Sequence, residues 1–229
     1  LTAEAALRSG AGLVSVATLA ASVPLVQAGR PEIMTHAVVD AAQLAPLLAR
    51  ASVIAIGPGL GQGPWAQALF GAVRDLPLPL VVDADALNLL AINPQQREGW
   101  CLTPHPGEAA RLLGLADARA VNADRYAAVS ALRARYGGAI ILKGAGSLVA
   151  GPAGIGVVTA GNPGMASGGM GDVLTGIVAA LCAQGMDLPT AAASGAMVHA
   201  MAADRVAARD GERGLLASDL LPELRRLLN

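Results

Sequence analysis

Short apolar runs alternate with helical patterns along most of this chain. Buried strands are expected at residues 13–18, 52–56, 80–83, 100–103 and 139–142. Helices are expected between them at residues 40–50, 64–74, 85–91, 106–113 and 122–136. Alternation of this kind is typical of βαβ units, so the sequence predicts an α/β fold in which helices cover both faces of a largely parallel sheet.

The pattern changes in the last third of the chain. Residues 147–150 and 155–159 flank a glycine-bounded turn and predict a hairpin, and helices are expected at residues 173–184, 188–209 and 218–228. A length of 229 residues without a linker fits one domain, residues 1–229. Because the first residue is not methionine and a helical pattern starts at once, we expect an N-terminal segment or a fused domain to precede it.

Composition narrows the class of partner. Hydrophobic residues make up 54% of the chain and charged residues 14%, which supports a large core and excludes disorder. A formal net charge of -1 and 2% aromatic residues give no basic or stacking surface, so we expect small-molecule partners and no nucleic acid. Cys101 and Cys182 lack metal-ligand spacing, and the apolar run 173–186 is too short to span a membrane. With no signal peptide or lipid anchor in the sequence, a cytoplasmic location is expected.

A glycine-rich loop at residues 160–172 carries the clearest chemical signal. It contains five glycines and ends on Asp172, directly before an expected apolar helix. Glycines let backbone N–H groups approach an anion, and a helix N-terminus adds further donors, so phosphate is the expected ligand. A carboxylate beside phosphate needs a chemical reason, and we predict that Asp172 is a base acting on a hydroxyl next to a phosphoryl group. The alternative is that Asp172 only caps the helix.

Ligands of open α/β sheets bind at the carboxyl ends of the strands. Four successive expected strands end in glycines or ionisable groups, in segments 57–61, 83–85, 103–108 and 143–147. The first segment does not fit the spacing of a dinucleotide-binding loop, and in the last segment a lysine precedes the glycines, unlike a Walker loop. Each segment alone is therefore a weak signal, and their shared position is the stronger one.

Several polar residues in these segments allow two interpretations. Asp83 and Asp85 could hold Mg²⁺, but Asp85 fits better as the N-cap of the following helix. His105 lies between two prolines, where packing does not explain an imidazole, so a ligand contact is expected. Glu108 complements the dipole of a first helical turn. His199 lies on an Ala- and Met-rich helical face and is expected to be a core histidine.

In the order of its motifs, the chain resembles the ADP-dependent NAD(P)H-hydrate dehydratases of the ribokinase-like superfamily, over essentially its whole length. The motifs are Ile56-Gly-Pro-Gly-Leu-Gly61, Val81-Val-Asp-Ala-Asp-Ala-Leu87, Leu102-Thr-Pro-His-Pro-Gly-Glu108, Leu142-Lys-Gly-Ala-Gly-Ser147 and Gly161-Asn-Pro-Gly-Met-Ala-Ser-Gly-Gly-Met-Gly-Asp172. The resemblance implies a metabolite-repair lyase that returns the (6S)-hydrate of NADH or NADPH to the functional cofactor. ADP, or ATP in eukaryotic members, would phosphorylate the C6 hydroxyl, and phosphate would then leave.

The resemblance also implies site residues and partners. Position by position these are Gly61, His105 and Asp172 for the hydrate; Lys143, Gly144, Ala145, Gly146, Ser147 and Gly171 for the nucleotide; Gly168, Gly169, Met170 and Gly171 as the anion hole; and Asn162, Asp83 and Asp85 as further candidates. Mg²⁺ is expected to come with the nucleotide phosphates and not to occupy a dedicated protein site. A fused or separate hydrate epimerase and a second copy of the chain are the expected protein partners.

Two other functions stay open. A ribokinase-like kinase of a vitamin precursor, of the hydroxymethylpyrimidine or hydroxyethylthiazole type, would use a base beside an anion hole equally well. A nucleotide-binding sensor without chemistry is the other. Segments 103–108 and 162–165 favour the dehydratase over the kinase, and the presence of Asp172 argues against the sensor.

Overall fold

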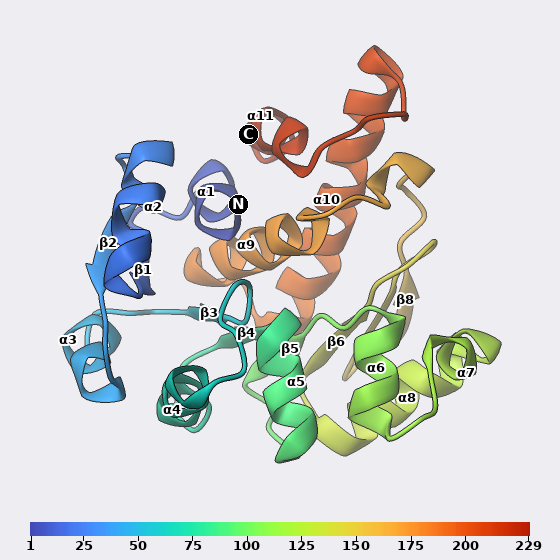
Figure 1. Cartoon of the computed structure of the whole chain (residues 1–229). Helices are drawn as coiled ribbons and strands as arrows, with labels where there is room; N and C mark the ends of the chain where they lie inside the picture. Colours follow the sequence, from blue (N-terminus) through green and yellow to red (C-terminus); the bar gives the residue numbers. More distant parts are fainter.

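The main sheet has six strands in the order β3-β4-β5-β6-β7-β8 and lies between two layers of helices (Figure 1). The computed structural model describes residues 1–229. The strands are β3 (Ile54–Ile56), β4 (Leu80–Val82), β5 (Trp100–Leu102), β6 (Ala139–Leu142), β7 (Leu148–Gly151) and β8 (Gly154–Val157). β3 to β6 are parallel, and β6, β7 and β8 are antiparallel, so the expected hairpin closes one end of a largely parallel sheet.

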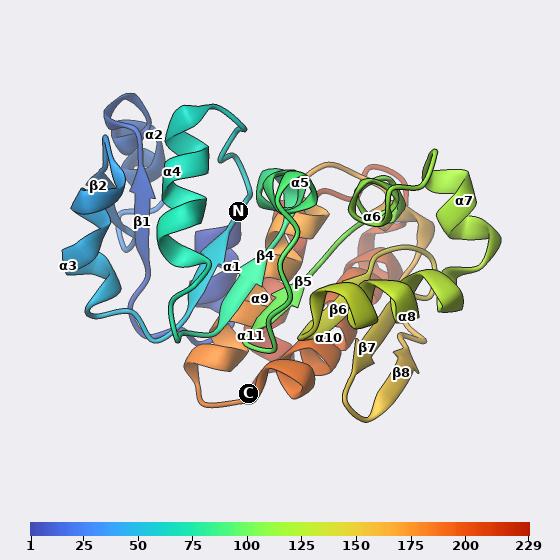
Figure 2. The ribbon, with the colours of Figure 1, turned by 90° about the horizontal axis from the view of Figure 1, so that it is seen from below.

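Side chains of the central strands alternate between two hydrophobic clusters, as the period of a strand requires. Leu80 and Trp100 face a cluster formed with α4 (Pro64–Val73), α5 (Ala84–Ile92), α6 (Pro106–Leu113), α7 (Ala118–Ala123) and α8 (Arg125–Tyr136). Val81 and Cys101 face the other, formed with α1 (Thr2–Arg8), α9 (Met170–Ala183), α10 (Leu188–Asp210) and α11 (Leu221–Leu227). Figure 2 shows the two helical layers on opposite faces. The predicted α/β architecture is confirmed, and no helix combines the length and apolar character needed to cross a lipid bilayer.

The first predicted strand does not belong to the main sheet. β1 (Ser15–Thr18) pairs in parallel with β2 (Met34–Ala37), and the two form a separate sheet beside α2 (Val23–Gly29) and α3 (Ala45–Leu48) (Figure 1). None of the residues of β1 is fully buried, so the expectation of a buried strand there was wrong. β2 was not predicted, because Met-Thr-His-Ala has neither an apolar run nor a clean alternation.

Aspartates and prolines set several helix boundaries that differ from the prediction. The helix expected at 122–136 is divided at Asp124, whose carboxylate accepts a hydrogen bond from Ala127 N at 2.9 Å and starts α8. The helix expected at 40–50 is a 3₁₀ turn capped by Asp40 and followed by the four-residue α3. The helix expected at 218–228 likewise begins as a 3₁₀ turn before α11.

Candidate active site

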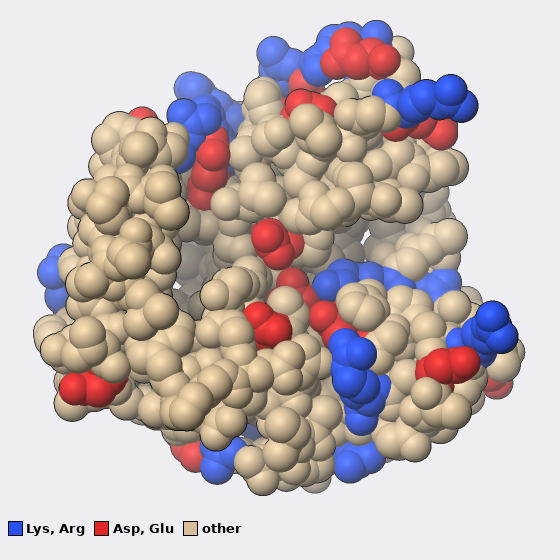
Figure 3. All heavy atoms as spheres, viewed as in Figure 1, with Lys and Arg blue, Asp and Glu red and all other residues tan.

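The carboxyl ends of β4 and β6 meet the first turn of α9 at one edge of the main sheet. Gly171 shows how close this approach is, because a Cβ added there would lie 3.0 Å from Lys143 Nζ and 3.4 Å from Asp83 Oδ2. Figure 3 shows acidic groups, with basic groups beside them, gathered in the hollowed centre of this face. The edge predicted from the sequence therefore brings together segments that lie far apart in the chain.

Asp172 lies in the first turn of α9. The helix starts at Met170, and its N-cap is Gly169 in a left-handed conformation, with φ of +86° and no side-chain cap. The capping interpretation of Asp172 is therefore wrong, since another residue holds that position. Burial raises the pKa of Asp172, and the nearby Asp83 carboxylate raises it further, whereas Lys143 opposes both effects. A half-buried carboxylate with a raised pKa is suited to take up a proton.

The first turn of α9 also offers backbone donors. The opening N–H groups of a helix have no acceptor within it, and their dipoles favour an anion at this end. Gly169 fits tightly here, because a Cβ added to it would lie 2.4 Å from Leu1 Cδ1 and 3.2 Å from Ala217 Cβ. The segment Gly168 to Gly171 therefore lies at the helix end where backbone donors are unpaired, and its role as an anion hole stays a prediction.

Asp83 and Lys143 form a buried ion pair beneath this turn. Lys143 Nζ lies 2.8 Å from Asp83 Oδ1, and Thr175 Oγ1 of α9 donates a hydrogen bond of 2.9 Å to Asp83 Oδ2. Burial would raise the pKa of Asp83, but the charge and hydrogen bond of Lys143, with hydrogen bonds from Thr103 and Thr175, outweigh it and hold the pKa below its usual value. Thr175 was missed from the sequence, because nothing local marks a threonine in an apolar helix as a partner of a residue 92 positions away.

Asp85 holds the loop that follows β3. Its Oδ2 accepts a hydrogen bond of 2.8 Å from Gly61 N, and its Oδ1 accepts one of 3.4 Å from Gln62 Nε2. The predicted N-cap role of Asp85 was wrong, because Asp83 occupies the N-cap position of α5. Asp85 therefore holds the backbone of Gly61, a residue of the predicted hydrate site.

His105 is the N-cap of α6. Its Nδ1 accepts hydrogen bonds from Gly107 N at 2.9 Å and Glu108 N at 3.4 Å, while Glu108 Oε2 accepts one of 2.8 Å from His105 N. The prediction missed this structural role for the imidazole and for Glu108. Burial lowers the pKa of His105, so the ring is neutral near pH 7 with its proton on Nε2. Half of the side chain is exposed, and its Nε2 lies 3.5 Å from Glu108 Oε1.

The loop Lys143 to Ser147 is closed by its own serine and supported from α8. Ser147 Oγ accepts from Gly144 N at 3.3 Å and donates to Gly144 O at 3.1 Å. Arg125, which the sequence analysis did not select, donates from its guanidinium to Ala145 O at 2.6 Å and Leu142 O at 3.3 Å. Hydrogen bonds within the chain therefore hold the conformation of this loop.

The glycine loop is anchored to α10, the helix that also carries His199. Asn162 Nδ2 and Gly161 N both donate to the carboxylate of Asp204 on α10, each at 2.8 Å, so Asn162 anchors the loop to this helix. His199 is buried on α10 as expected, and burial lowers its pKa to about 4, although its Nε2 has no partner. Asp204 carried no sequence signal, because its partners lie more than 40 residues earlier.

The side chains do not form a protein cage for Mg²⁺. No group of three or more His, Cys, Asp or Glu residues could hold a metal ion, and the oxygens of Asp83 and Asp85 are already hydrogen-bonded within the chain. Asp172 is the carboxylate of this edge that could add a ligand to Mg²⁺ carried by nucleotide phosphates. Bound there, the ion would supply neutralising charge to the phosphates.

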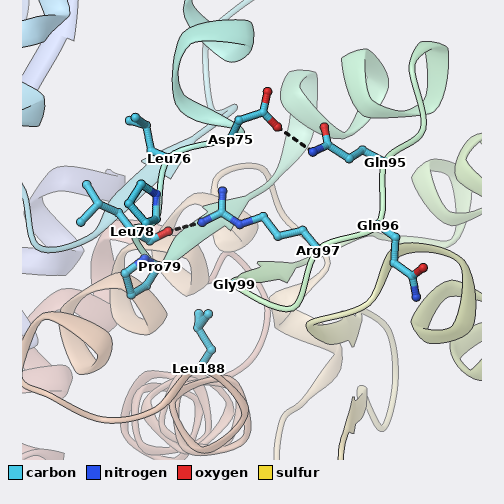
Figure 4. Close-up of a pocket in the computed structure, with 10 residues that line it drawn as sticks. Asp75, Leu76, Leu78, Pro79, Gln95, Gln96, Arg97, Gly99 and Leu188 are labelled. Atoms are coloured by element: carbon cyan, nitrogen blue, oxygen red, sulfur yellow. Dashed lines mark hydrogen bonds between the residues drawn. The ribbon is translucent and has the colours of Figure 1, made fainter.

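A cavity of about 480 Å³ lies at the opposite edge, by the amino ends of β4 and β5 (Figure 4). Its polar groups already have partners: Gln95 donates to Asp75, and Arg97 donates to the carbonyl oxygens of Arg74 and Leu78. Arg97 therefore joins the loops that precede the two strands. This cavity does not extend the site at the carboxyl edge.

The sequence profile of the family described as NAD(P)H-hydrate dehydratase matches residues 1–226. The chain belongs to this family. It is 54% identical over 230 residues to the bifunctional NAD(P)H-hydrate repair enzyme Nnr of Coxiella burnetii, covering 100% of this chain and 47% of that protein. It is 40% identical over 240 residues to the ADP-dependent (S)-NAD(P)H-hydrate dehydratase of Neisseria meningitidis serogroup B, covering 100% of this chain and 79% of that one.

A solved dehydratase has the same fold. The ADP/ATP-dependent NAD(P)H-hydrate dehydratase of Bacillus subtilis, co-crystallised with ATP and Mg²⁺, matches with a TM-score of 0.85 and 29% identity over 100% of this chain and 86% of that chain. Solved ribokinase-like proteins share the fold as well, so the expected fold class is confirmed. The present chain spans about half the length of the bifunctional relatives that it matches.

Proposed function

We propose that this dehydratase-family chain, as one domain, returns the (6S)-hydrate of NADH or NADPH to NAD(P)H and consumes ADP. The observation that carries the proposal is the half-buried carboxylate of Asp172 in the first turn of the 14-residue helix α9. A base beside unpaired backbone donors is what transfer of a phosphoryl group to a hydroxyl requires. The name of the N. meningitidis relative supports ADP as the donor.

The reaction takes two steps. Asp172 accepts the proton of the C6 hydroxyl while the hydroxyl oxygen attacks the terminal phosphorus of ADP, and AMP leaves. The N–H groups around Gly168 to Gly171 bind the oxygens of the phosphoryl group as charge moves onto them. The C6–O bond then breaks, phosphate leaves with the bonding electrons, and loss of a proton from C5 restores the double bond of the dihydronicotinamide ring.

The two substrates are proposed to approach α9 from different segments. The loop Lys143 to Ser147 offers backbone N–H groups and a hydroxyl to the nucleotide. Gly61, whose N–H donates to Asp85, and the half-exposed imidazole of His105 are our candidates for contact with the hydrate. A neutral imidazole donor suits a hydrate amide or hydroxyl, because it adds no charge that would compete with the phosphates.

The test is recovery of dihydronicotinamide absorbance when purified protein is mixed with NADPH hydrate and Mg²⁺, with ADP, ATP or no nucleotide in parallel. Recovery with ADP and none without nucleotide is the expected result. Phosphorylation of hydroxymethylpyrimidine or hydroxyethylthiazole by the same preparation, with no recovery of absorbance, would replace the proposal by the kinase alternative. Nucleotide binding with neither activity would support the sensor.

The rate is expected to fall on the acid side at a higher pH than for an ordinary aspartate. The base works only when ionised, and burial together with the Asp83 carboxylate raises the pKa of Asp172, so protonation removes activity earlier as the pH drops. Lys143 opposes this shift without reversing it. The measurement is kcat against pH, with circular dichroism showing that the protein stays folded. A rate that holds down to acid unfolding would contradict a base of this kind.

Arg125→Ala is expected to raise the KM for ADP about tenfold and leave kcat nearly unchanged, since the variant loses two charge-assisted hydrogen bonds that hold the nucleotide loop. Steady-state kinetics with varied ADP measures both quantities. Arg119→Ala, an exposed arginine on α7, is the matched control and should leave both unchanged. An unchanged KM in Arg125→Ala would show that the loop keeps its shape without this support.

The proposal keeps the expected partners and location. The exposed Leu13 and Leu25 and the absence of charged residues between Arg8 and Arg30 support contact with a second copy of the chain. The word bifunctional in the names of several relatives supports a fused or separate second activity, for which a hydrate epimerase is our candidate. Two buried free cysteines, Cys101 and Cys182, suit the reducing cytoplasm.

A further inference from the structure

Lys143 is the one lysine of this chain, among sixteen Lys and Arg residues. Its side chain is 20% exposed, and its ammonium fits closely under α9, because a Cβ on Gly171 would already come within 3.0 Å of Nζ. An ammonium is a compact point charge, whereas a guanidinium is a planar group with five donors. A chain that otherwise uses arginine for its basic side chains therefore has its one compact cation at this helix end.

The Asp83 carboxylate does not cap α5, although Asp83 occupies the N-cap position of that helix. Asp83 is the N-cap of α5, where an aspartate usually accepts a hydrogen bond from the helix backbone, yet its side chain makes no cap bond. Its side chain is 2% exposed, and its two oxygens bind Lys143 Nζ and Thr175 Oγ1 instead. The carboxylate thus connects the ends of β4 and β6 to α9.

Thr175 connects Asp83 to the N-terminal part of α9, where Asp172 lies. It follows Asp172 by three residues, so the two side chains lie on the same face of the helix, one turn apart. Glu108 Oε2 lies 3.7 Å from Lys143 Nζ, which leaves Asp83 as the close partner of the ammonium. Through Asp83, the Lys143 ammonium is thus linked to a hydroxyl of the helix that carries Asp172.

We propose, resting on the function proposed above, that Asp83 and Thr175 are positioning residues for the phosphoryl-transfer centre. They fix the Lys143 ammonium against Gly171, between the nucleotide loop and Asp172, where it offsets negative charge on the transferred group. A buried ion pair adds little stability by itself, because desolvation cancels most of the attraction. Its value here lies in placing one cation at the helix end where phosphate oxygens bind.

Thr175→Val tests this role with a change that keeps the shape of the side chain. Without the hydroxyl, Asp83 loses its hydrogen bond to α9, and we expect kcat to fall about tenfold while the KM for ADP changes less than about twofold. Thr175→Ser, which keeps the hydroxyl, should restore most of kcat. Thr190→Val makes the same chemical change at an exposed position of α10 and should leave both constants unchanged. A normal kcat in Thr175→Val, with or without a lower unfolding midpoint, would reduce the contact to a structural one.

The single lysine supplies a readout that does not depend on catalysis. Protein that carries lysine labelled with carbon-13 at Cε alone gives one lysine signal, from Lys143, in a carbon NMR spectrum. We expect this signal to shift in Thr175→Val and in Asp83→Asn, and to stay in place in Thr175→Ser and Thr190→Val. An unmoved signal in both Thr175→Val and Asp83→Asn would overturn the positioning. Failure of the wild-type protein to restore NADPH hydrate would instead overturn the proposed function, so the two failures are distinguishable.

Discussion

Asp172→Asn is expected to abolish turnover, lowering kcat by about a thousandfold, because the amide keeps the shape of the side chain but cannot take the proton of the substrate hydroxyl. The substitution removes no helix cap, since Gly169 holds that position. A carboxyl group whose pKa is raised by folding weakens the folded state above its unfolded pKa, so a neutral amide should leave stability at pH 7 unchanged or improved. The measurements are kcat, ADP affinity by calorimetry and the unfolding midpoint.

Asp117→Asn is the matched control for this substitution. Asp117 is an exposed aspartate that caps α7 by accepting hydrogen bonds from Arg119 N at 2.8 Å and Ala120 N at 3.2 Å. Its replacement should leave kcat intact. A near-normal kcat in Asp172→Asn would remove Asp172 from the mechanism, and a loss of ADP binding along with kcat would assign it to the nucleotide site instead.

The layered fold could be predicted because each of its central strands is buried on both faces. Strands such as Leu80–Val82 and Ala139–Leu142 are uninterrupted apolar runs, and that pattern is specific to a doubly covered parallel sheet. The same reasoning placed the polar segments at one edge, because parallel strands all end there. β1 was predicted as a strand but wrongly as a buried one, and β2 escaped prediction, since a small, partly exposed sheet lacks this pattern.

The contacts within the site could not be predicted, because they join residues far apart in the sequence. Asp83 pairs with Lys143 over 60 positions and with Thr175 over 92, and local pattern says nothing about such distances. Asp85 shows a different error. The preference for aspartate at a helix N-cap was applied to Asp85, but Asp83 occupies the N-cap position of α5. Ala84 between the two aspartates has φ of +47°, the one positive value outside glycine, and this conformation costs about 1–3 kcal/mol. The strained residue separates a carboxylate that serves the ion pair from one that holds Gly61.

Gly57→Ala is expected to destabilise the protein by at least about 3 kcal/mol, because the added methyl group has no room and the backbone conformation excludes it. Gly57 is buried with φ of +127°, and a Cβ there would lie 1.7 Å from the carbonyl oxygen of Asp83. That carbonyl accepts the first hydrogen bond of α5, from Ala86 N at 3.1 Å. The neighbouring backbone, and not a flexible side chain, would have to move.

Any movement that removes this overlap must displace Asp83. We therefore expect the substitution to alter the geometry of the candidate active site and to lower the stability of the fold. The Lys143 ammonium is held by the Asp83 carboxylate at 2.8 Å, and we expect the folded fraction of Gly57→Ala to show a displaced lysine signal and a reduced kcat. Gly63→Ala is the control in the same loop, since a Cβ there meets nothing within 4 Å and φ is −71°; it should cost less than about 1 kcal/mol. Urea unfolding of both variants measures the difference. Equal stability would mean that the loop after β3 can move away from Asp83 at little cost, and a normal lysine signal in a destabilised Gly57→Ala would separate the fold of this loop from the placement of the cation.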